Sequence, residues 1–272
     1  MPRPLALVGL AFTLMISTSR ADTGSPIRTA YQVPKTAQAQ EIYREMRARR
    51  VLEGLREIVS MVRLPQTLTL RLSECDGEIN AWYEPKTRSV TVCYEYIQDV
   101  RDRAYRATLP AGVTYHDALF GTLAQVFLHE TGHALFDLLD VPVLGREEDA
   151  ADQFAALVVL RLRPAQARQI IAGSSILFTS FGAEDKLEKN TFADDHGLFY
   201  QRLYNLLCLA YGSDQRAFSY LVERGDLPKE RAENCRDEYG LAAHAMDRLF
   251  HSHLQGGRMG RERIRRGFRW LN

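Results

Sequence analysis

The sequence predicts an α+β fold in which a small mixed sheet precedes a largely helical C-terminal part. Alternating apolar and polar residues, the pattern of half-buried strands, are confined to residues 67–96. Apolar residues at helical spacing occur before that region, from 41 to 62, and again from 114 to the end of the chain. The 272 residues are 46% hydrophobic and 25% charged, which suits a folded domain with a core and excludes intrinsic disorder.

The N-terminal segment has the pattern of a secretory signal peptide. Arg3 precedes an apolar run at 5–16, which is shorter than the ~20 residues that a membrane-spanning helix needs. Ser19 and Ala21 supply the small residues that precede a cleavage site. We therefore expect residues 1–21 to be removed, and the mature bacterial protein to be periplasmic or secreted, with no transmembrane segment.

The mature chain divides into three parts by composition. Residues 22–40 are polar and contain proline, so a flexible lead-in is expected there. An amphipathic helix is predicted from Glu41 to Val62, and Pro65 stops it. We expect one folded domain over residues 41–257 and a separate basic tail over 258–272.

Three short strands are predicted after the first helix. Residues 67–72 alternate, residues 79–83 are short and aromatic, and residues 89–96 place apolar side chains at a period of two. A Pro-Lys-Thr stretch at 85–87 predicts a turn between the last two strands. From residue 114 onwards the pattern is helical.

Four cysteines are expected to form two disulfides. An even number permits complete pairing, and disulfides persist in the oxidising compartments that an exported chain reaches. We favour Cys75 with Cys93 and Cys208 with Cys235, because each pair closes a short local loop. No CxxC spacing occurs, so the sequence gives no indication of a zinc site made of cysteines.

A long helix with metal-binding residues is predicted after Thr114, which forms a capping box with Asp117. The helix contains an HExxH motif made by His129, Glu130 and His133. Two imidazoles at i and i+4 lie on one face of a helix and can bind one metal ion, while the glutamate can act as a general base on water. We predict a single Zn²⁺ as the cofactor, because two imidazoles and a carboxylate suit zinc.

A catalytic zinc site needs a third protein ligand, and acids at the start of the next predicted helix supply candidates. Glu148 and Asp152 are spaced i, i+4, so Glu148 could bind zinc while Asp152 accepts the second ring N–H of a zinc-bound histidine. Spacing does not exclude Glu147 or Asp149, since acids in a first turn are also favoured by the helix dipole. Asp137, one turn after the motif, is expected beside the ligands rather than among them.

The motif at 129–133 and the Glu-xxx-Asp spacing at 148–152 resemble the gluzincin metallopeptidases, the group of thermolysin and neprilysin. Asn80 and Ala81, followed by two aromatic residues, resemble the edge strand on which those enzymes hold an extended peptide. An edge strand also offers unpaired N–H and C=O groups that a peptide can join, which is an independent reason to expect substrate binding there.

The HETGH sequence and a downstream Asp-His pair at 195–196 are also similar to a bacterial family known only as predicted metallopeptidases. The resemblance covers roughly residues 65–240. It implies a zincin-like core with a peptide or protein substrate.

His196 has two interpretations. In thermolysin-like enzymes a downstream histidine, supported by an acid, stabilises the oxyanion of the tetrahedral intermediate, and the resemblance implies this catalytic role for His196. The spacing to the acids Asp194 and Asp195 departs from that of the relatives, and a histidine beside capping acids at a helix start is the alternative. Tyr200 and Tyr204 follow and could serve instead.

These observations predict an exported zinc peptidase in which Glu130 deprotonates water for attack on a peptide bond. One alternative is a catalytically silent member of the fold that binds peptides in the cell envelope. A second is another HExxH amidase, such as a deformylase, with Cys93 as third ligand, which disulfide pairing would exclude. A third is a structural zinc site, which should be closed.

The formal charge of +1 gives no indication of nucleic-acid binding and conceals an uneven distribution. The tail at 258–272 holds six arginines and one glutamate, while residues 22–257 are mildly acidic. We expect the tail to be a solvated extension, rather than a segment that docks on an anionic surface or on the acidic body of the protein.

Overall fold

The computed structural model describes residues 26–255 and 257–271, so the expected signal peptide lies outside the described residues. Within the described part, no helix combines the length and the apolar composition needed to cross a membrane.

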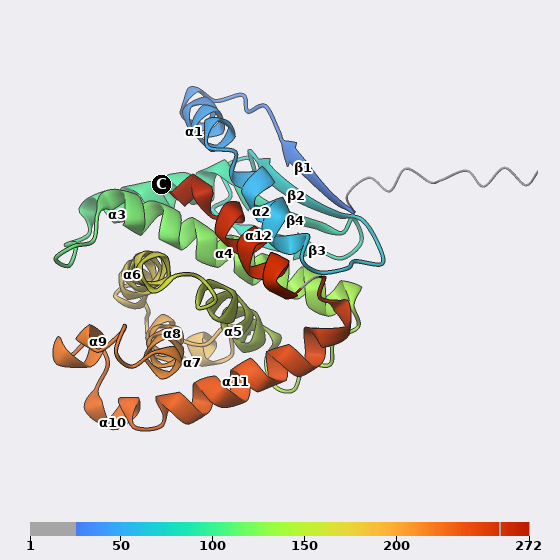
Figure 1. The fold of residues 1–272 in the computed structure, drawn as a ribbon. Coiled ribbons are helices and arrows are strands. Elements are labelled where there is room, and N and C mark those ends of the chain that lie inside the picture. Colours follow the sequence, from blue (N-terminus) through green and yellow to red (C-terminus); the bar gives the residue numbers. More distant parts are fainter. Residues whose placement is uncertain (1–25, 256, 272) are drawn as a thin grey trace, which may run out of the picture.

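A small mixed sheet forms one side of the molecule (Figure 1), with strand order β1-β2-β4-β3. β1 (Ile27–Tyr31), β2 (Leu68–Ser73) and β4 (Ser89–Cys93) are parallel, and β3 (Ala81–Glu84) pairs antiparallel with β4 at the sheet edge. The mixed α+β architecture is the one the sequence predicts. β3 lies at the edge on which substrate binding is expected.

The flexible lead-in expected at 22–40 is a wrong prediction over most of its described length. Residues 27–31 form β1, which pairs in register with β2, and Ile27 is fully buried. Residues 37–40 belong to the first helix, whose N-cap Thr36 accepts a hydrogen bond from the Ala39 backbone N–H. The polar composition hid this strand, because Ile27 alone of its five residues is buried.

The helix predicted over residues 41–62 is divided into α1 (Ala37–Ala48) and α2 (Val51–Val59). Arg50 adopts a left-handed conformation with φ of 56°, which interrupts the helical hydrogen bonds. The predicted strand at 89–96 is likewise shorter, because α3 (Tyr94–Arg106) begins directly after Cys93.

α4 (Tyr115–Leu138) is the central element and packs against the sheet and α3 on one side and against α5 and α6 on the other (Figure 1). Its predicted capping box is present, since Thr114 and Asp117 bond to each other's backbone N–H groups. Eighteen of its residues are buried, which is why the helix is apolar nearly all round.

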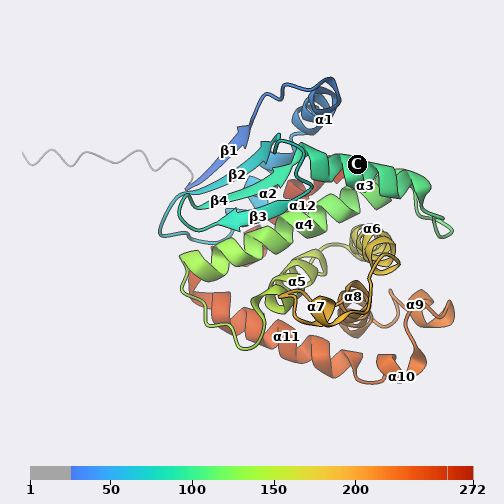
Figure 2. The same ribbon diagram turned by 180° about the vertical axis from the view of Figure 1, so that it is seen from behind.

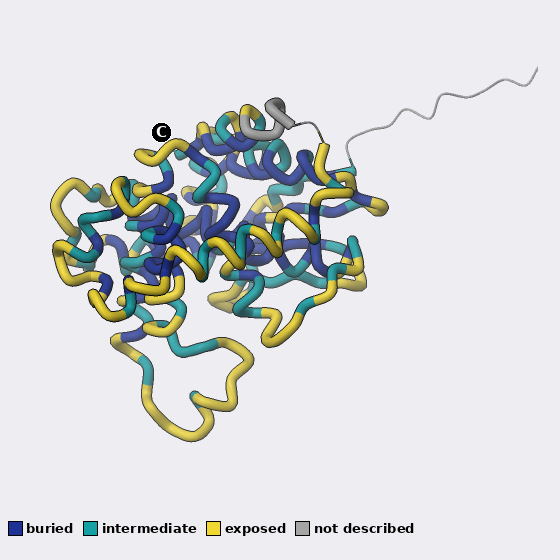
Figure 3. The backbone as a smooth tube through the Cα atoms, turned by 60° about the horizontal axis from the view of Figure 1, so that its bottom comes forward, coloured by how far each residue is buried: buried dark blue, intermediate teal, exposed yellow. Residues whose placement is uncertain are grey.

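The remaining helices complete the domain and lie mainly below α4 in Figure 1. They are α5 (Glu147–Val159), α6 (Pro164–Gly182), α7 (Lys189–Phe192), α8 (Phe199–Ser213), α9 (Tyr220–Glu223), α10 (Lys229–Ala232), α11 (Cys235–Phe250), α12 (Gly257–Gly267) and the 3₁₀ turns η1 (His251–His253) and η2 (Arg269–Leu271). Figure 3 shows the buried residues gathered in the interior, with exposed segments along the outer loops.

The basic C-terminal segment is not the solvated extension that the sequence suggests. α12 packs on α2, and the side chains of Ile264, Phe268 and Trp270 are buried in the core. Gly54 of α2 leaves room for this contact, since a Cβ there would lie 2.2 Å from the carbonyl oxygen of Gly267. The apolar residues carry the packing, while Arg266 forms an ion pair with Glu57 of α2 and Arg269 is exposed.

Both cysteine pairs stand at bonding distance in the favoured connectivity. The sulfur atoms are 2.07 Å apart in Cys75–Cys93 and 2.00 Å apart in Cys208–Cys235. Cys93 is therefore bonded to Cys75 and cannot serve as the metal ligand that a deformylase-like site would need. The second disulfide ties α8 to α11.

Candidate metal centre

The HExxH residues lie on α4 where the N-terminal end of α5 crosses it. Gly132 permits the close approach, because a Cβ there would lie 3.3 Å from the Cα of Ala151 on α5. The first turn of α5, which carries Glu147 and Glu148, is thereby held beside His129 and His133.

Three side chains converge on one point between the two helices. Oε2 of Glu148 is 3.0 Å from Nε2 of His129 and 3.5 Å from Nε2 of His133. The two Nε2 atoms are 3.2 Å from each other. Nitrogen and oxygen atoms bound to one four-coordinate zinc at about 2.0–2.2 Å are separated by about 3.3 Å, so the three atoms have the mutual spacing of a zinc ligand set.

The outer nitrogens of these histidines face carboxylates. Nδ1 of His129 is 2.9 Å from Oδ1 of Asp152, and Nδ1 of His133 is 2.7 Å from Oε1 of Glu147. Carboxylates in this position accept the Nδ1–H and leave Nε2 free to bind metal. Asp152 thus lies beside Nδ1 of His129, and Glu147 lies on the outer side of His133 rather than at the point of convergence.

Asp152 is itself held by Arg202 of α8. Nε and Nη2 of Arg202 lie 2.7 Å and 2.9 Å from the two oxygens of Asp152. Although burial acts in the opposite direction, the hydrogen bonds from Arg202 and His129 hold the pKa of Asp152 well below its ordinary value. Asp152 is therefore a carboxylate that keeps His129 in one orientation.

His196 reaches the same point from the loop before α8. Its Nε2 is 2.8 Å from Oε2 of Glu148, and its ring lies nearly parallel to that of His129, with 6.2 Å between centroids. Oδ1 of Asp194 accepts hydrogen bonds from the backbone N–H and lies 3.2 Å from Nδ1 of His196. The atoms of His129, Glu148 and His196 that face one another form a group that could hold a metal ion.

A cleft of about 340 Å³ opens beside this group. Glu130 lines it, and burial raises the pKa of its carboxyl above the ordinary value. A carboxylate with a raised pKa is a better proton acceptor near neutral pH. Phe178 and Phe199 form an apolar wall, and the rings of both lie within 5.5 Å of the Arg202 guanidinium.

The edge strand reaches the same cleft. Asn80 and Ala81 line it, and Figure 2 shows β3 beside α4, with α5, α7 and α8 on the opposite side. Ala81 pairs with Val92 of β4, so one edge of β3 faces away from the sheet. Ala81 of β3 and Glu130 of α4 thus line the same cleft.

A protein-family model matches residues 31–250, most of the chain, and its family carries the description "Putative metallopeptidase" (DUF4344). The chain belongs to this family. Comparisons with curated proteins and with solved structures find no match. Membership agrees with a metal-binding group and with the peptidase activity that the family description suggests.

Some residues of this DUF4344 member that the sequence suggested for the site make their contacts elsewhere. Asp137 accepts a hydrogen bond of 2.6 Å from the Tyr83 hydroxyl and is not among the residues that line the cleft. Asp149 pairs with Arg146, and Tyr200 packs over Gly182. Neither tyrosine proposed as a substitute for His196 is among the residues that line the cleft.

Arg202 and Tyr96 are among the cleft residues to which sequence reasoning assigned no role. Arg202 had a detectable signal, because it lies at helical spacing between the apolar residues Phe199 and Leu206 of α8. A charged residue within an apolar stripe requires a buried partner. Tyr96 lies three residues after the last strand and has no such signal.

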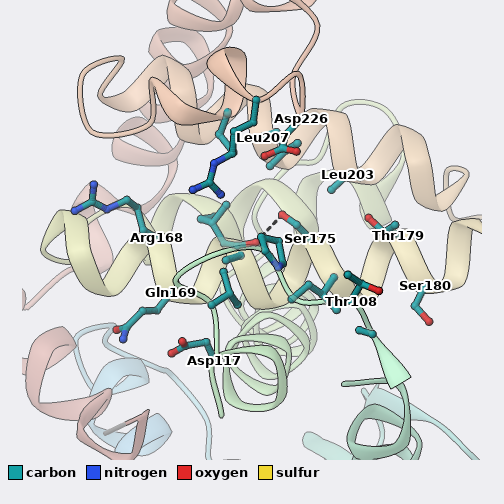
Figure 4. A pocket seen from close by; sticks show the side chains of 18 of the residues that line it. Thr108, Asp117, Arg168, Gln169, Ser175, Thr179, Ser180, Leu203, Leu207 and Asp226 are labelled. Carbon is teal, nitrogen blue, oxygen red and sulfur yellow. Dashed lines mark hydrogen bonds between the residues drawn. The ribbon is translucent and has the colours of Figure 1, made fainter. Parts of the chain in front are cut away.

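A larger cavity, of about 1050 Å³, lies along the other face of α6 (Figure 4). Ser175 and Thr179 of α6 line it, between Leu203 and Leu207 of α8 on one side and Thr108 on the other. No histidine or cysteine is among its lining residues, so this cavity of the family member is separate from the metal-binding group.

Proposed function

We propose that the protein is an exported zinc-dependent peptidase of the gluzincin type, built on a zincin-like core. The observation that carries this proposal is the convergence of His129, His133 and Glu148 within 3.5 Å of one another. Membership of a family described as metallopeptidases supports it. The two disulfides support export, since such bonds persist in oxidising compartments.

His129, His133 and Glu148 would hold the metal, and their donor set of two imidazoles and one carboxylate suits zinc. Bound zinc supplies a Lewis acid that lowers the pKa of water and polarises the carbonyl of a peptide. Asp152 and Arg202 fix the orientation of His129. Contacts among these five side chains, which come from α4, α5 and α8, hold the metal-binding atoms in position.

Glu130 is the general base. Its position in the cleft places it beside the space where water and the peptide carbonyl would meet, and its raised pKa favours acceptance of a proton from water. The carboxylic acid formed in this way then gives its proton to the nitrogen of the departing amine. His196, once free of Glu148, would donate a hydrogen bond to the developing oxyanion.

The substrate is an extended peptide or protein segment. The free edge of β3 offers backbone N–H and C=O groups to a strand that adds to the sheet, and Asn80 and Ala81 stand where this strand would enter the cleft. A strand bound there lies between the sheet edge and Glu130.

A Glu130→Gln variant tests the proposal. It should retain zinc, measured by metal analysis of the purified protein, and should lose hydrolysis of a broad peptide library. Equal turnover by the wild type and the variant would contradict the proposal. A zinc-loaded wild type that cleaves no peptide of the library would favour a binding protein of the cell envelope instead.

Chelation distinguishes a catalytic zinc from a structural one. The hydrophobic core joins the sheet to α4 and the surrounding helices, and two disulfides crosslink the chain. Removing zinc should therefore abolish hydrolysis while the far-UV circular dichroism spectrum remains that of a folded protein. Unfolding on chelation would indicate a structural metal.

A further inference from the structure

Three histidines around Glu148 share one arrangement. Each has a carboxylate at its Nδ1: Asp152 for His129, Glu147 for His133 and Asp194 for His196. Each also directs its Nε2 towards the same oxygen, Oε2 of Glu148, at 3.0, 3.5 and 2.8 Å respectively.

This arrangement identifies the nitrogen that each ring makes available. A carboxylate at Nδ1 accepts the Nδ1–H, which places the lone pair of the neutral imidazole on Nε2. Histidines that bind metals in proteins almost always donate their other ring N–H to a carboxylate, a backbone carbonyl or a water, and here all three have a carboxylate. His196 therefore has the pairing of a metal ligand, in the same form as the two histidines of the HExxH motif.

His196 differs from the other two histidines in the chain segment that carries it. It lies near the end of a segment of residues 183–198, which is exposed over most of its length and contains the short helix α7. The ends of the segment are tied together, because Oδ2 of Asp185 accepts a hydrogen bond from the Phe199 backbone N–H and the rings of Phe181 and Phe199 stack. We call this segment the flap.

The histidine of the flap is more exposed to solvent than the two histidines of α4. The side chain of His196 is 45% exposed, against 6% for His129 and 13% for His133. His129 and His133 are carried by the buried helix α4, whereas His196 is carried by a loop at the mouth of the cleft. A loop can open as a unit when its two ends lie close together and its own residues make few buried contacts.

We propose that His196 is a fourth protein donor to the metal in the resting protein, and that the flap must withdraw it before a peptide can be cleaved. The inference rests on the proposed function and adds a regulated entry step to it. A resting site with four protein donors has no free position for water, so peptide entry and withdrawal of His196 are coupled. Once withdrawn, the ring can take up a proton from water at Nε2 and then donate a hydrogen bond to the oxyanion.

Zinc affinity and the spectrum of the cobalt-substituted protein test this inference without reference to activity. Zinc is removed with a chelator, and the protein is titrated with Zn²⁺ against a chromophoric competitor. The wild type is compared with His196→Ala, with Asp194→Asn, and with His244→Ala, which removes an exposed histidine of α11. Far-UV circular dichroism shows that each variant is folded.

His196→Ala should weaken zinc binding by about tenfold or more, and Asp194→Asn should weaken it by a smaller factor. His244→Ala should bind zinc as the wild type does. The visible absorption bands of the Co²⁺ protein should change in His196→Ala, because a protein nitrogen is replaced by water.

Zinc affinity of His196→Ala within twofold of the wild type, with an unchanged Co²⁺ spectrum, would overturn this inference and leave the proposed function in place. A wild type that binds no zinc would overturn both. The two failures are therefore distinguishable in a single series of titrations.

Discussion

Arg202 holds Asp152 through two hydrogen bonds, of 2.7 and 2.9 Å, across 50 residues of sequence. Asp152 in turn accepts from Nδ1 of His129, so the arginine acts on the metal-binding group through two other side chains. Both partners are largely shielded from solvent, with side chains 12% and 17% exposed. A buried pair of this kind leaves a costly unpaired charge when one partner is removed.

Replacing Arg202 with methionine should therefore affect both stability and metal binding. We expect the free energy of unfolding to fall by about 3–5 kcal/mol, because Asp152 loses its partner. Zinc affinity should fall by about 10–100-fold, because His129 loses its fixed orientation. Chemical denaturation and zinc competition measure the two effects. Arg161→Ala, which breaks the exposed pair with Asp247, is the control and should change stability by less than about 1 kcal/mol.

Tyr83 links the edge strand to α4 through its hydrogen bond to Asp137. A Tyr83→Phe variant should keep its zinc and fold but bind extended peptides less well, since β3 is no longer fixed relative to the HExxH helix. We expect kcat/KM to fall by about 2–10-fold, the effect of one hydrogen bond of about 0.5–1.5 kcal/mol. An unchanged kcat/KM would show that β3 is positioned by the sheet alone.

Glu74 gives a pH-dependent contribution to stability that is remote from the metal-binding group. Its carboxylate accepts hydrogen bonds from the backbone N–H groups of Lys35 and Thr36, and these bonds hold the pKa of Glu74 below its ordinary value of 4.5. Because the unfolded state binds the proton more readily, this stabilisation is present above pH 4.5 and is lost as the pH falls through the lowered pKa.

Thermal unfolding of Glu74→Gln checks this sign. The variant should have a Tm a few degrees below that of the wild type at pH 7, and the difference should shrink as the pH is lowered below about 4.5. A difference that grows on acidification would contradict the assignment.

The C-terminal segment should contribute to the stability of the folded domain. Trp270 is buried, and its ring packs edge-on against Phe120 of α4, with 5.9 Å between the ring centroids. Trp270→Ala should lower the free energy of unfolding by about 3–5 kcal/mol, because it leaves a cavity beside the core. Arg269→Ala, next to it and exposed, should change stability by less than about 0.5 kcal/mol. Similar effects of the two substitutions would argue against the packing described for this segment.

Local patterns were sufficient for much of the fold. The capping box at Thr114, the HExxH helix and the strands from 68 to 93 depend on neighbouring residues, and periodicity detects them. The i, i+4 spacing of Glu148 and Asp152 places both carboxylates on one face of α5, which is a property of any helix. Disulfide pairing could be anticipated because both loops are short.

The sequence by itself therefore determined that this chain has an α+β domain in which one long helix carries an HExxH motif. The tertiary structure alone decided that Arg202 supports Asp152, that His196 faces Glu148, and that residues 27–31 and the basic C-terminal segment belong to the folded domain. These features join segments that are far apart in the chain. Their partners are set by how α8, β1 and α12 pack, and no periodicity within one segment carries that information.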